Sequence, residues 1–165
     1  MTRTYTGRAW VFGDHVNTDQ ILPGRFLDRP MEDVGQYAMA GLDVTFTQRV
    51  KPGDFVVAGA NFGCGSSREA AVIALKQAGV AAVIARSFGR IFFRNAINNG
   101  FPAAVIPETS RIAQGDPLRL DLGARTVTDL RTGDTLPLQS LTGISQQILE
   151  AGGIVPFTLA RLGRR

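Results

Sequence analysis

The sequence contains almost none of the side chains that bind metals or form disulfides. Cys64 is its only cysteine and His15 is its only histidine. A single cysteine cannot form an internal disulfide, and an iron–sulfur cluster takes three or four thiolates. A lone histidine likewise excludes a histidine-rich metal site. We therefore expect no metal site in this chain.

Lysine is scarce as well, and arginine carries the basic charge. Lys51 and Lys76 are the only lysines, and 18 basic against 14 acidic residues give a formal net charge of +4. The arginines are scattered rather than gathered in a stripe, which argues against a nucleic-acid partner. No apolar run approaches the length of a membrane span, and the N-terminus lacks the apolar core of a signal peptide. We expect a soluble, cytoplasmic protein that binds no membrane.

Three short apolar runs alternate with two helix-forming segments in the middle of the chain. The runs 54–58, 80–85 and 101–106 are typical of buried strands, and the segments 70–78 and 88–98 are typical of helices. Strand–helix–strand–helix–strand at this spacing predicts a βαβαβ core with parallel strands, and hence an α/β fold. A length of 165 residues fits one domain, 1–165, with a sizeable core.

The flanking patterns predict further elements: a strand over 5–12 and helices over 31–40 and 145–151, with 44–50 open between helix and strand. Three shorter alternating runs predict a small antiparallel meander beside the parallel sheet: 118–122, 126–130 and 135–138. Gly152 and Gly153 are expected to end the last helix, and residues 161–165 are expected to form a frayed tail.

A glycine-rich segment, 59–69, lies between a predicted strand and a predicted helix. We expect Ser66 or Ser67 to cap this helix, whose positive N-terminus and free N–H groups attract a carboxylate or phosphate. Arg68, expected in the first helical turn, opposes the helix dipole and gains nothing there unless an anion is also present. The segment therefore predicts an anion-binding loop with two hydroxyls and one guanidinium.

Each of these residues also has a simpler explanation. Helix capping alone explains the two serines, and a tight turn explains Cys64 better than a reactive thiolate does. A dinucleotide-binding loop would need a third glycine and an acidic residue after the next strand, where Arg86 stands instead. His15 is the only base for a serine triad, and the nearby Asp14 and Asp19 either bring a carboxylate to the site or form turns. The residues alone indicate a carboxylate- or phosphate-binding site whose chemistry stays open.

Three motifs make the sequence recognisable: NTDQILP (17–23), NFGCGSSRE (61–69) and ARSFGRIFFRN (85–95). They closely resemble those of the 3-isopropylmalate dehydratase small subunits, which are the swivel-domain subunits of the aconitase superfamily. The likeness runs in matching order over nearly the whole chain. It implies a three-layer β/β/α swivelling domain.

The resemblance also implies a partner and a reaction. A separate large subunit, in a heterodimer or heterotetramer, would hold a 4Fe-4S iron–sulfur cluster whose open iron acts as a Lewis acid on the substrate hydroxyl and a carboxylate. The swivel domain would close over that cluster and supply the base. Water would be eliminated from a hydroxy di- or tricarboxylic acid and added back across the alkene, with 3-isopropylmalate of leucine biosynthesis as the expected substrate.

Carried onto this chain, the family motif gives Ser66 as the general base, acting as an alkoxide on a carbon-bound proton. Arg68 would clamp a substrate carboxylate with its planar fork and help to stabilise the alkoxide. Ser67 would donate a hydrogen bond to that carboxylate, and Asp19 would orient a neighbouring group. The segment after Pro23 and Gly24 corresponds to the family's substrate-selecting loop, which implies five substrate-binding residues: Arg25, Phe26, Leu27, Asp28 and Arg29.

Two departures from the family pattern leave the substrate open. Ala70 stands where the family usually has a histidine. The loop 26–29 matches neither the apolar version for an isopropyl group nor the arginine-bearing homoaconitase version. Homoaconitase-like enzymes and dehydratases of 2,3-dimethylmalate or citraconate are therefore alternatives. A non-catalytic anion- or nucleotide-binding module is the alternative from another class.

Overall fold

The computed structural model describes residues 3–163. Within these residues, the strands form a sheet in the order β4-β3-β2-β1-β5-β6-β7. Their bounds are β1 (Thr4–Val11), β2 (Phe55–Ala58), β3 (Ala82–Ala85), β4 (Ala103–Val105), β5 (Pro117–Asp121), β6 (Thr126–Asp129) and β7 (Thr135–Pro137). Strands β1 to β4 are parallel, and β5 to β7 continue the sheet in antiparallel pairs.

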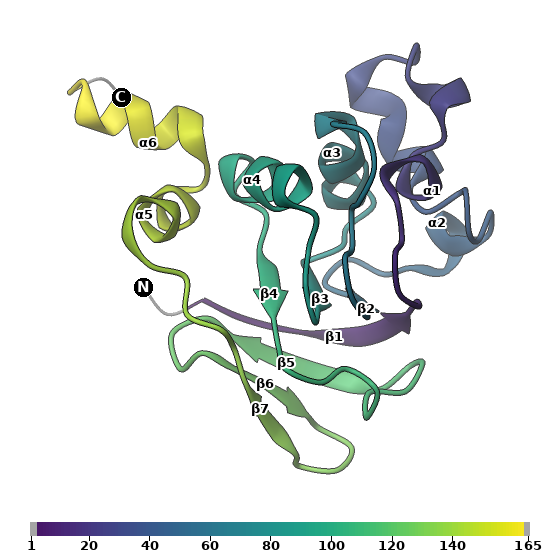
Figure 1. The fold of residues 1–165 in the computed structure, drawn as a ribbon, viewed down its shortest axis with the longest axis vertical. Coiled ribbons are helices and arrows are strands. Elements are labelled where there is room, and N and C mark those ends of the chain that lie inside the picture. Colours follow the sequence, from purple (N-terminus) through teal and green to yellow (C-terminus); the bar gives the residue numbers. More distant parts are fainter. Residues whose placement is uncertain (1–2, 164–165) are drawn as a thin grey trace.

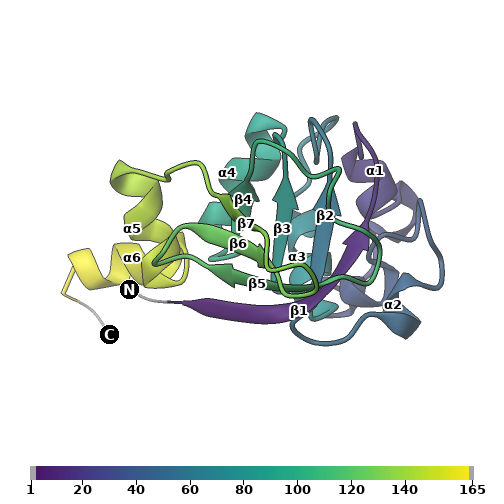
Figure 2. The same ribbon diagram turned by 90° about the horizontal axis from the view of Figure 1, so that it is seen from below.

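Strand β1 joins the two halves of this sheet. Its residues Thr4 to Arg8 pair antiparallel with β5, whereas Ala9 to Val11 pair parallel with β2. Strands β5 to β7 lie beneath the parallel strands in Figure 1 and across them in Figure 2. The predicted βαβαβ core and the predicted meander are both confirmed. The meander, however, is hydrogen-bonded to the parallel strands through β1 and is not a separate sheet.

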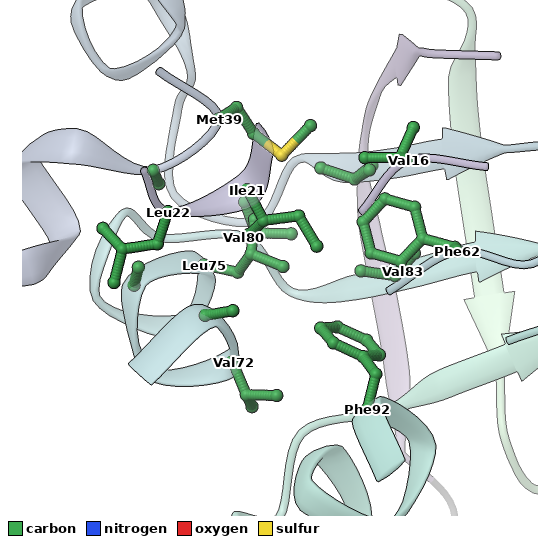
Figure 3. Close-up of a cluster of buried hydrophobic side chains, with 14 of the residues drawn as sticks. Val16, Ile21, Leu22, Met39, Phe62, Val72, Leu75, Val80, Val83 and Phe92 are labelled. Carbon is green, nitrogen blue, oxygen red and sulfur yellow. The ribbon is translucent and has the colours of Figure 1, made fainter. Parts of the chain in front are cut away.

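Alternate residues of the parallel strands enter two different cores. On one face the buried side chains pack in the cluster of Figure 3, against the helices: Val56, Ala58, Val83 and Ala85. On the other face they pack against the antiparallel strands: Phe55, Val57, Ala82 and Ile84. Successive side chains of a strand point to opposite faces, so strands buried on both faces are apolar throughout. The antiparallel strands, the parallel strands and the helices therefore form three layers, which confirms the β/β/α class.

The helices are α1 (Thr18–Ile21), α2 (Phe46–Arg49), α3 (Glu69–Gln77), α4 (Arg90–Asn98), α5 (Gly143–Ala151) and α6 (Ile154–Arg161), with 3₁₀ helices η1 (Gly24–Phe26) and η2 (Met31–Tyr37). The segment 44–50, left open between helix and strand, contains the short helix α2. The helix expected over 31–40 is the tighter and shorter η2, in which Gly35 lies directly against Gln77 of α3.

Helix α6 corrects the prediction that 145–151 is the last helix. Gly152 and Gly153 have φ angles of 92° and 129° and end α5, as expected, but they turn the chain directly into α6. Pro156 is tolerated in the first turn of α6, where backbone N–H groups have no intrahelical acceptor. Among residues 3–163, no helix is both long and apolar enough to cross a bilayer.

Candidate active site

The glycine-rich loop between β2 and α3 carries two serines that cap no helix. Helix α3 begins at Glu69, and its N-cap is Arg68, with extended φ and ψ of −138° and 97° and no side-chain capping bond. The prediction that Ser66 or Ser67 caps this helix is therefore wrong, as is the placement of Arg68 in the first turn. Both serines are exposed in the loop ahead of the helix, so capping no longer explains them.

Arg68 lies before the helix because its side chain is held by a distant segment of the chain. Its Nη1 donates to Oδ1 of Asp19 and to the carbonyl oxygen of Leu22, both at 3.0 Å. Within residues 3–163, its Nε and Nη2 donate to no protein acceptor. One side of the guanidinium is thus anchored, and the other is available for a bidentate bond to a carboxylate.

Asp19 is the carboxylate that lies beside Arg68. It lies in α1, whose start is fixed by a capping box: Asn17 Oδ1 accepts from the N–H of Gln20, and Gln20 Oε1 accepts from the N–H of Asn17. Asp19 Oδ1 also accepts from the N–H of Gly24 at 2.9 Å. The hydrogen bond from Gly24, followed by that from Arg68, lowers the pKa of Asp19 below its usual 3.8. Asp19 is therefore ionised at neutral pH.

Backbone pairing brings the segment 16–19 against the glycine-rich loop. Gly63 donates its N–H to Val16 O at 2.7 Å, and Thr18 donates its N–H to Cys64 O at 2.9 Å. Gly63 has a φ of 80°, and a β-carbon there would collide with the ring of Phe92 in α4. A glycine is therefore required at this crossing.

The segment 25–29, predicted to select the substrate, packs against Tyr37 of η2 in a stack of aromatic and guanidinium groups. The rings of Phe26 and Tyr37 are stacked, with centroids 3.9 Å apart and planes at 6°. Arg25 lies 4.6 Å from the centroid of Phe26, and Arg29 lies 5.9 Å from that of Tyr37. Phe26 packs on the core, while the other four predicted loop residues are exposed: Arg25, Leu27, Asp28 and Arg29.

The remaining candidate residues contact other parts of the loops and do not reach Arg68. Asp14 Oδ1 accepts from the N–H of Ala60 at 2.7 Å and lies 3.9 Å from Nη2 of Arg86. His15 is paired with Asn61 at 3.4 Å, and within the described residues it makes no hydrogen bond to Ser66. The thiol of Cys64 is free and half-buried. Of the candidate carboxylates, Asp19 and not Asp14 reaches Arg68.

Sequence reasoning missed three groups at this site: the hydroxyl of Thr18, the carbonyl of Leu22 and the N–H of Gly24. Two are backbone groups and carry no side-chain signal. The capping box over 17–20 was the available signal for the helix start that contains Thr18, but it carries no signal for the burial of that residue. The pairing of that helix with the glycine-rich loop could not be read from it.

Comparison with known proteins agrees with the fold. Residues 16–108, more than half of the chain, match the aconitase C-terminal domain. The chain is 50% identical over 151 residues to 3-isopropylmalate dehydratase small subunit 1 of Methanopyrus kandleri, covering 90% of this chain and 89% of the relative. It is 48% identical over 154 residues to the isopropylmalate/citramalate isomerase small subunit of Methanocaldococcus jannaschii, covering 92% and 91%.

A solved structure gives the same result. A crystal structure of 3-isopropylmalate dehydratase from Methanocaldococcus jannaschii superposes with a TM-score of 0.93 at 43% identity, covering 97% of this chain and 96% of that one. Fold and sequence together define an aconitase-type swivel domain. Within that class, the chain belongs to the family of 3-isopropylmalate dehydratase small subunits. The resemblance drawn from the three sequence motifs is confirmed.

Proposed function

We propose that this chain is the small subunit of a cytoplasmic, two-subunit hydro-lyase that interconverts 2-isopropylmalate and 3-isopropylmalate. The observation that carries the proposal is the pairing of two residues. Ser66 is exposed and does not cap α3, and the nearby Arg68 is hydrogen-bonded on one side of its guanidinium and open on the other. The names of the similar proteins, which mention isopropylmalate and citramalate, support this substrate class.

Ser66 acts as the base. The backbone N–H groups of Ser66 and Ser67 donate to no protein acceptor within residues 3–163, and the N-terminus of α3 lies two residues further on. Together with Arg68, these groups stabilise an alkoxide at Ser66 Oγ. In the dehydration direction, Ser66 Oγ takes a proton from the substrate carbon, the C–H electron pair forms the C=C bond, and the hydroxyl leaves the neighbouring carbon as hydroxide with the C–O electron pair. Addition of water in the opposite sense returns the proton from Ser66 to carbon.

Arg68 and Ser67 bind a substrate carboxylate. The open Nε and Nη2 side of Arg68 offers two parallel N–H donors, which match the two oxygens of a carboxylate. Asp19 and the carbonyl of Leu22 hold the opposite side and so fix the plane of the guanidinium. Asp19 thus serves as an orienting group rather than as a base, because its lowered pKa makes it a poor proton acceptor at neutral pH.

In this proposal the iron–sulfur cluster belongs to the large subunit. Residues 3–163 contain no group of three or more His, Cys, Asp or Glu side chains that could hold a metal ion, so they do not fit the ligation of a cluster. When bound in the partner, the cluster supplies Lewis-acid activation of the substrate hydroxyl. The part of this chain is limited to the base, the carboxylate clamp and the selecting loop.

One observation favours a second substrate, a homoaconitate-type tricarboxylic acid. Arg25 and Arg29 are both exposed in the selecting loop, and neither forms a salt bridge within residues 3–163. Their stacking on Phe26 and Tyr37 limits their motion, so they offer preorganised positive charge for a third carboxylate. The exposed Leu27 between them is instead suited to an isopropyl group.

Turnover by the assembled enzyme tests the proposal. The chain is coexpressed with its cognate large subunit, the cluster is rebuilt anaerobically, and kcat/KM is measured for isopropylmalate, homoaconitate, dimethylmalate and citraconate. We expect isopropylmalate to be preferred. Preference for homoaconitate would change the proposed substrate but leave the proposed reaction type unchanged. A formed complex with an intact cluster and no turnover of any of the four acids would contradict the proposal and favour a binding module.

A further inference from the structure

A buried hydroxyl lies directly beneath Ser66. Thr18 has only 2% of its surface exposed, and its Oγ1 is 2.9 Å from the carbonyl oxygen of Ser66 and 3.5 Å from Ser66 Oγ. The first distance is that of a good O–H···O bond, and the second lies at the outer limit. In the structure, therefore, the single proton of Thr18 Oγ1 is donated to the carbonyl of Ser66.

The backbone of Thr18 fixes this side chain in place. Its N–H donates to Cys64 O at 2.9 Å, and its C=O accepts from the N–H of Leu22 at 2.9 Å. A threonine side chain has few rotamers, and burial restricts it further. The hydroxyl hydrogen can still rotate about the Cβ–Oγ1 bond, because it is the only part of the group that packing does not hold.

We propose that Thr18 is a positioning residue whose hydroxyl turns from the carbonyl of Ser66 to Ser66 Oγ when Ser66 is deprotonated. This inference rests on the proposed function, in which Ser66 acts as an alkoxide. The proton lost by Ser66 goes to water. Thr18 keeps its own proton throughout, so that no covalent bond of Thr18 forms or breaks. Only the acceptor of its hydrogen bond changes.

The switch contributes to catalysis because it acts on one protonation state of Ser66 and not on the other. A neutral serine gains little from a second donor, whereas an alkoxide binds a short O–H donor strongly. Because Ser66 must lose its proton before it can act as the base, a donor that favours the alkoxide over the neutral serine raises the fraction of enzyme able to react without tightening substrate binding. The carbonyl that Thr18 releases belongs to an exposed residue, so water can take over as its donor.

The test compares variants in the assembled enzyme with its rebuilt cluster. Thr18→Val and Thr18→Ala remove the hydroxyl, Thr18→Ser keeps it, and Thr128→Val is the matched control. Thr128 is also buried, and its hydroxyl is bonded to that of Thr135 in the meander, away from the site. We expect Thr18→Val and Thr18→Ala to lower kcat about 100-fold, as loss of one oxyanion donor does. KM should stay near the wild-type value because Arg68 is intact.

Two further readouts separate this role from a structural one. A substrate deuterated at the carbon that loses its proton should show a larger isotope effect on kcat with Thr18→Val than with the wild type. Thr18→Ser should restore kcat, and Thr128→Val should leave kcat and the isotope effect unchanged. A Thr18→Val complex with normal kcat would overturn the inference. So would failure of both Thr18→Val and Thr18→Ala to assemble, because Thr18 would then be a folding residue.

Ser66→Ala, measured alongside, keeps the two hypotheses apart. If Ser66→Ala is inactive and Thr18→Val is fully active, the role of Thr18 is wrong and the base assignment stands. If Ser66→Ala keeps normal turnover, Ser66 is not the base, and the inference about Thr18 is overturned together with that part of the proposed function.

Discussion

Two aspartate–arginine pairs in this molecule have similar distances and opposite burial. At the site, Arg68 Nη1 is 3.0 Å from Asp19 Oδ1, and the arginine side chain is 20% exposed against 66% for the aspartate. In the antiparallel half, Arg131 Nε is 2.9 Å from Asp116 Oδ1, and the arginine is 55% exposed against 6% for the aspartate. The enclosed partner is the cation in one pair and the anion in the other.

The difference separates a pair arranged for binding from a pair arranged for stability. Asp116 also accepts from the N–H of Ala113, and Arg131, which follows β6, donates to it. The buried carboxylate therefore connects the turn before β5 with the loop after β6. Asp19 is the exposed partner and mainly orients the enclosed arginine. In the structural pair the buried group is the carboxylate, which accepts from one backbone N–H and from Arg131. A binding pair encloses the group that must keep one orientation and leaves one side of it open.

Loss of the site arginine should give the largest effect on activity. Arg68→Gln removes the carboxylate clamp and part of the alkoxide stabilisation, and we expect kcat/KM of the assembled enzyme to fall by about 1,000-fold or more. The matched variant Arg131→Gln should keep kcat/KM and lower the melting temperature. Comparable activity losses in both variants would remove the distinction between the pairs.

Replacing each aspartate separately should affect stability in the opposite order, with the larger loss at Asp116 and the smaller at Asp19. Asp116→Asn weakens the bonds of a buried carboxylate, and we expect the free energy of unfolding to fall by about 2 kcal/mol. Asp19→Asn concerns an exposed carboxylate and should change stability much less while lowering kcat/KM. Urea unfolding of the isolated chain measures the first quantity. A larger loss of stability for Asp19→Asn would contradict the comparison.

The stability difference should also depend on pH. The pKa of Asp116 lies below 3.8 in the folded chain, chiefly because of the hydrogen bond from Arg131. A carboxyl whose pKa is lowered by folding stabilises the folded state above its unfolded pKa, and this stabilisation is lost as pH falls through the folded value. The gap between wild type and Asp116→Asn should therefore be constant above about pH 5 and shrink below it. If the stability difference between wild type and Asp116→Asn instead grew as pH fell, the pKa of Asp116 would not be lowered by folding.

The smallest effect is expected for a third pair, whose arginine is exposed and which lies outside the site. Arg49 Nη2 is 2.8 Å from Asp43 Oδ2, with the arginine side chain largely in solvent. Arg49→Gln should cost less than about 1 kcal/mol in unfolding free energy and should not change kcat/KM. A stability loss as large as that of Asp116→Asn would mean that burial does not set the order.

The parallel core could be predicted from the sequence because it is encoded locally. Apolar runs such as 80–85 and the helix-forming segments between them carry their own periodicity, and the structure confirms them as strands and helices. An anion beside Arg68 was also expected, although Arg68 was placed in the first helical turn rather than at the N-cap. The source of this anion could not be predicted from the residues, since Asp14 and Asp19 have the same chemistry and differ in where the fold places them.

What could not be predicted depends on contacts between distant segments. The N-cap of α3 is Arg68 rather than a serine because Asp19 and Leu22, far earlier in the chain, hold its side chain. Thr18 meets Ser66 across a separation of 48 residues. Local capping preferences are weak beside such tertiary contacts. The error in the cap therefore lies at the functional site, where local rules are most often overridden.

Release of deuterium from substrate to solvent tests the base assignment most directly. The assembled enzyme is given isopropylmalate deuterated at the carbon that loses its proton, and Ser66→Ala is compared with Ser67→Ala, its neighbour in the same loop. We predict that the wild type and Ser67→Ala release deuterium, the latter more slowly, and that Ser66→Ala releases none while its complex and cluster remain intact. Deuterium release by Ser66→Ala at a rate near that of the wild type would contradict the account.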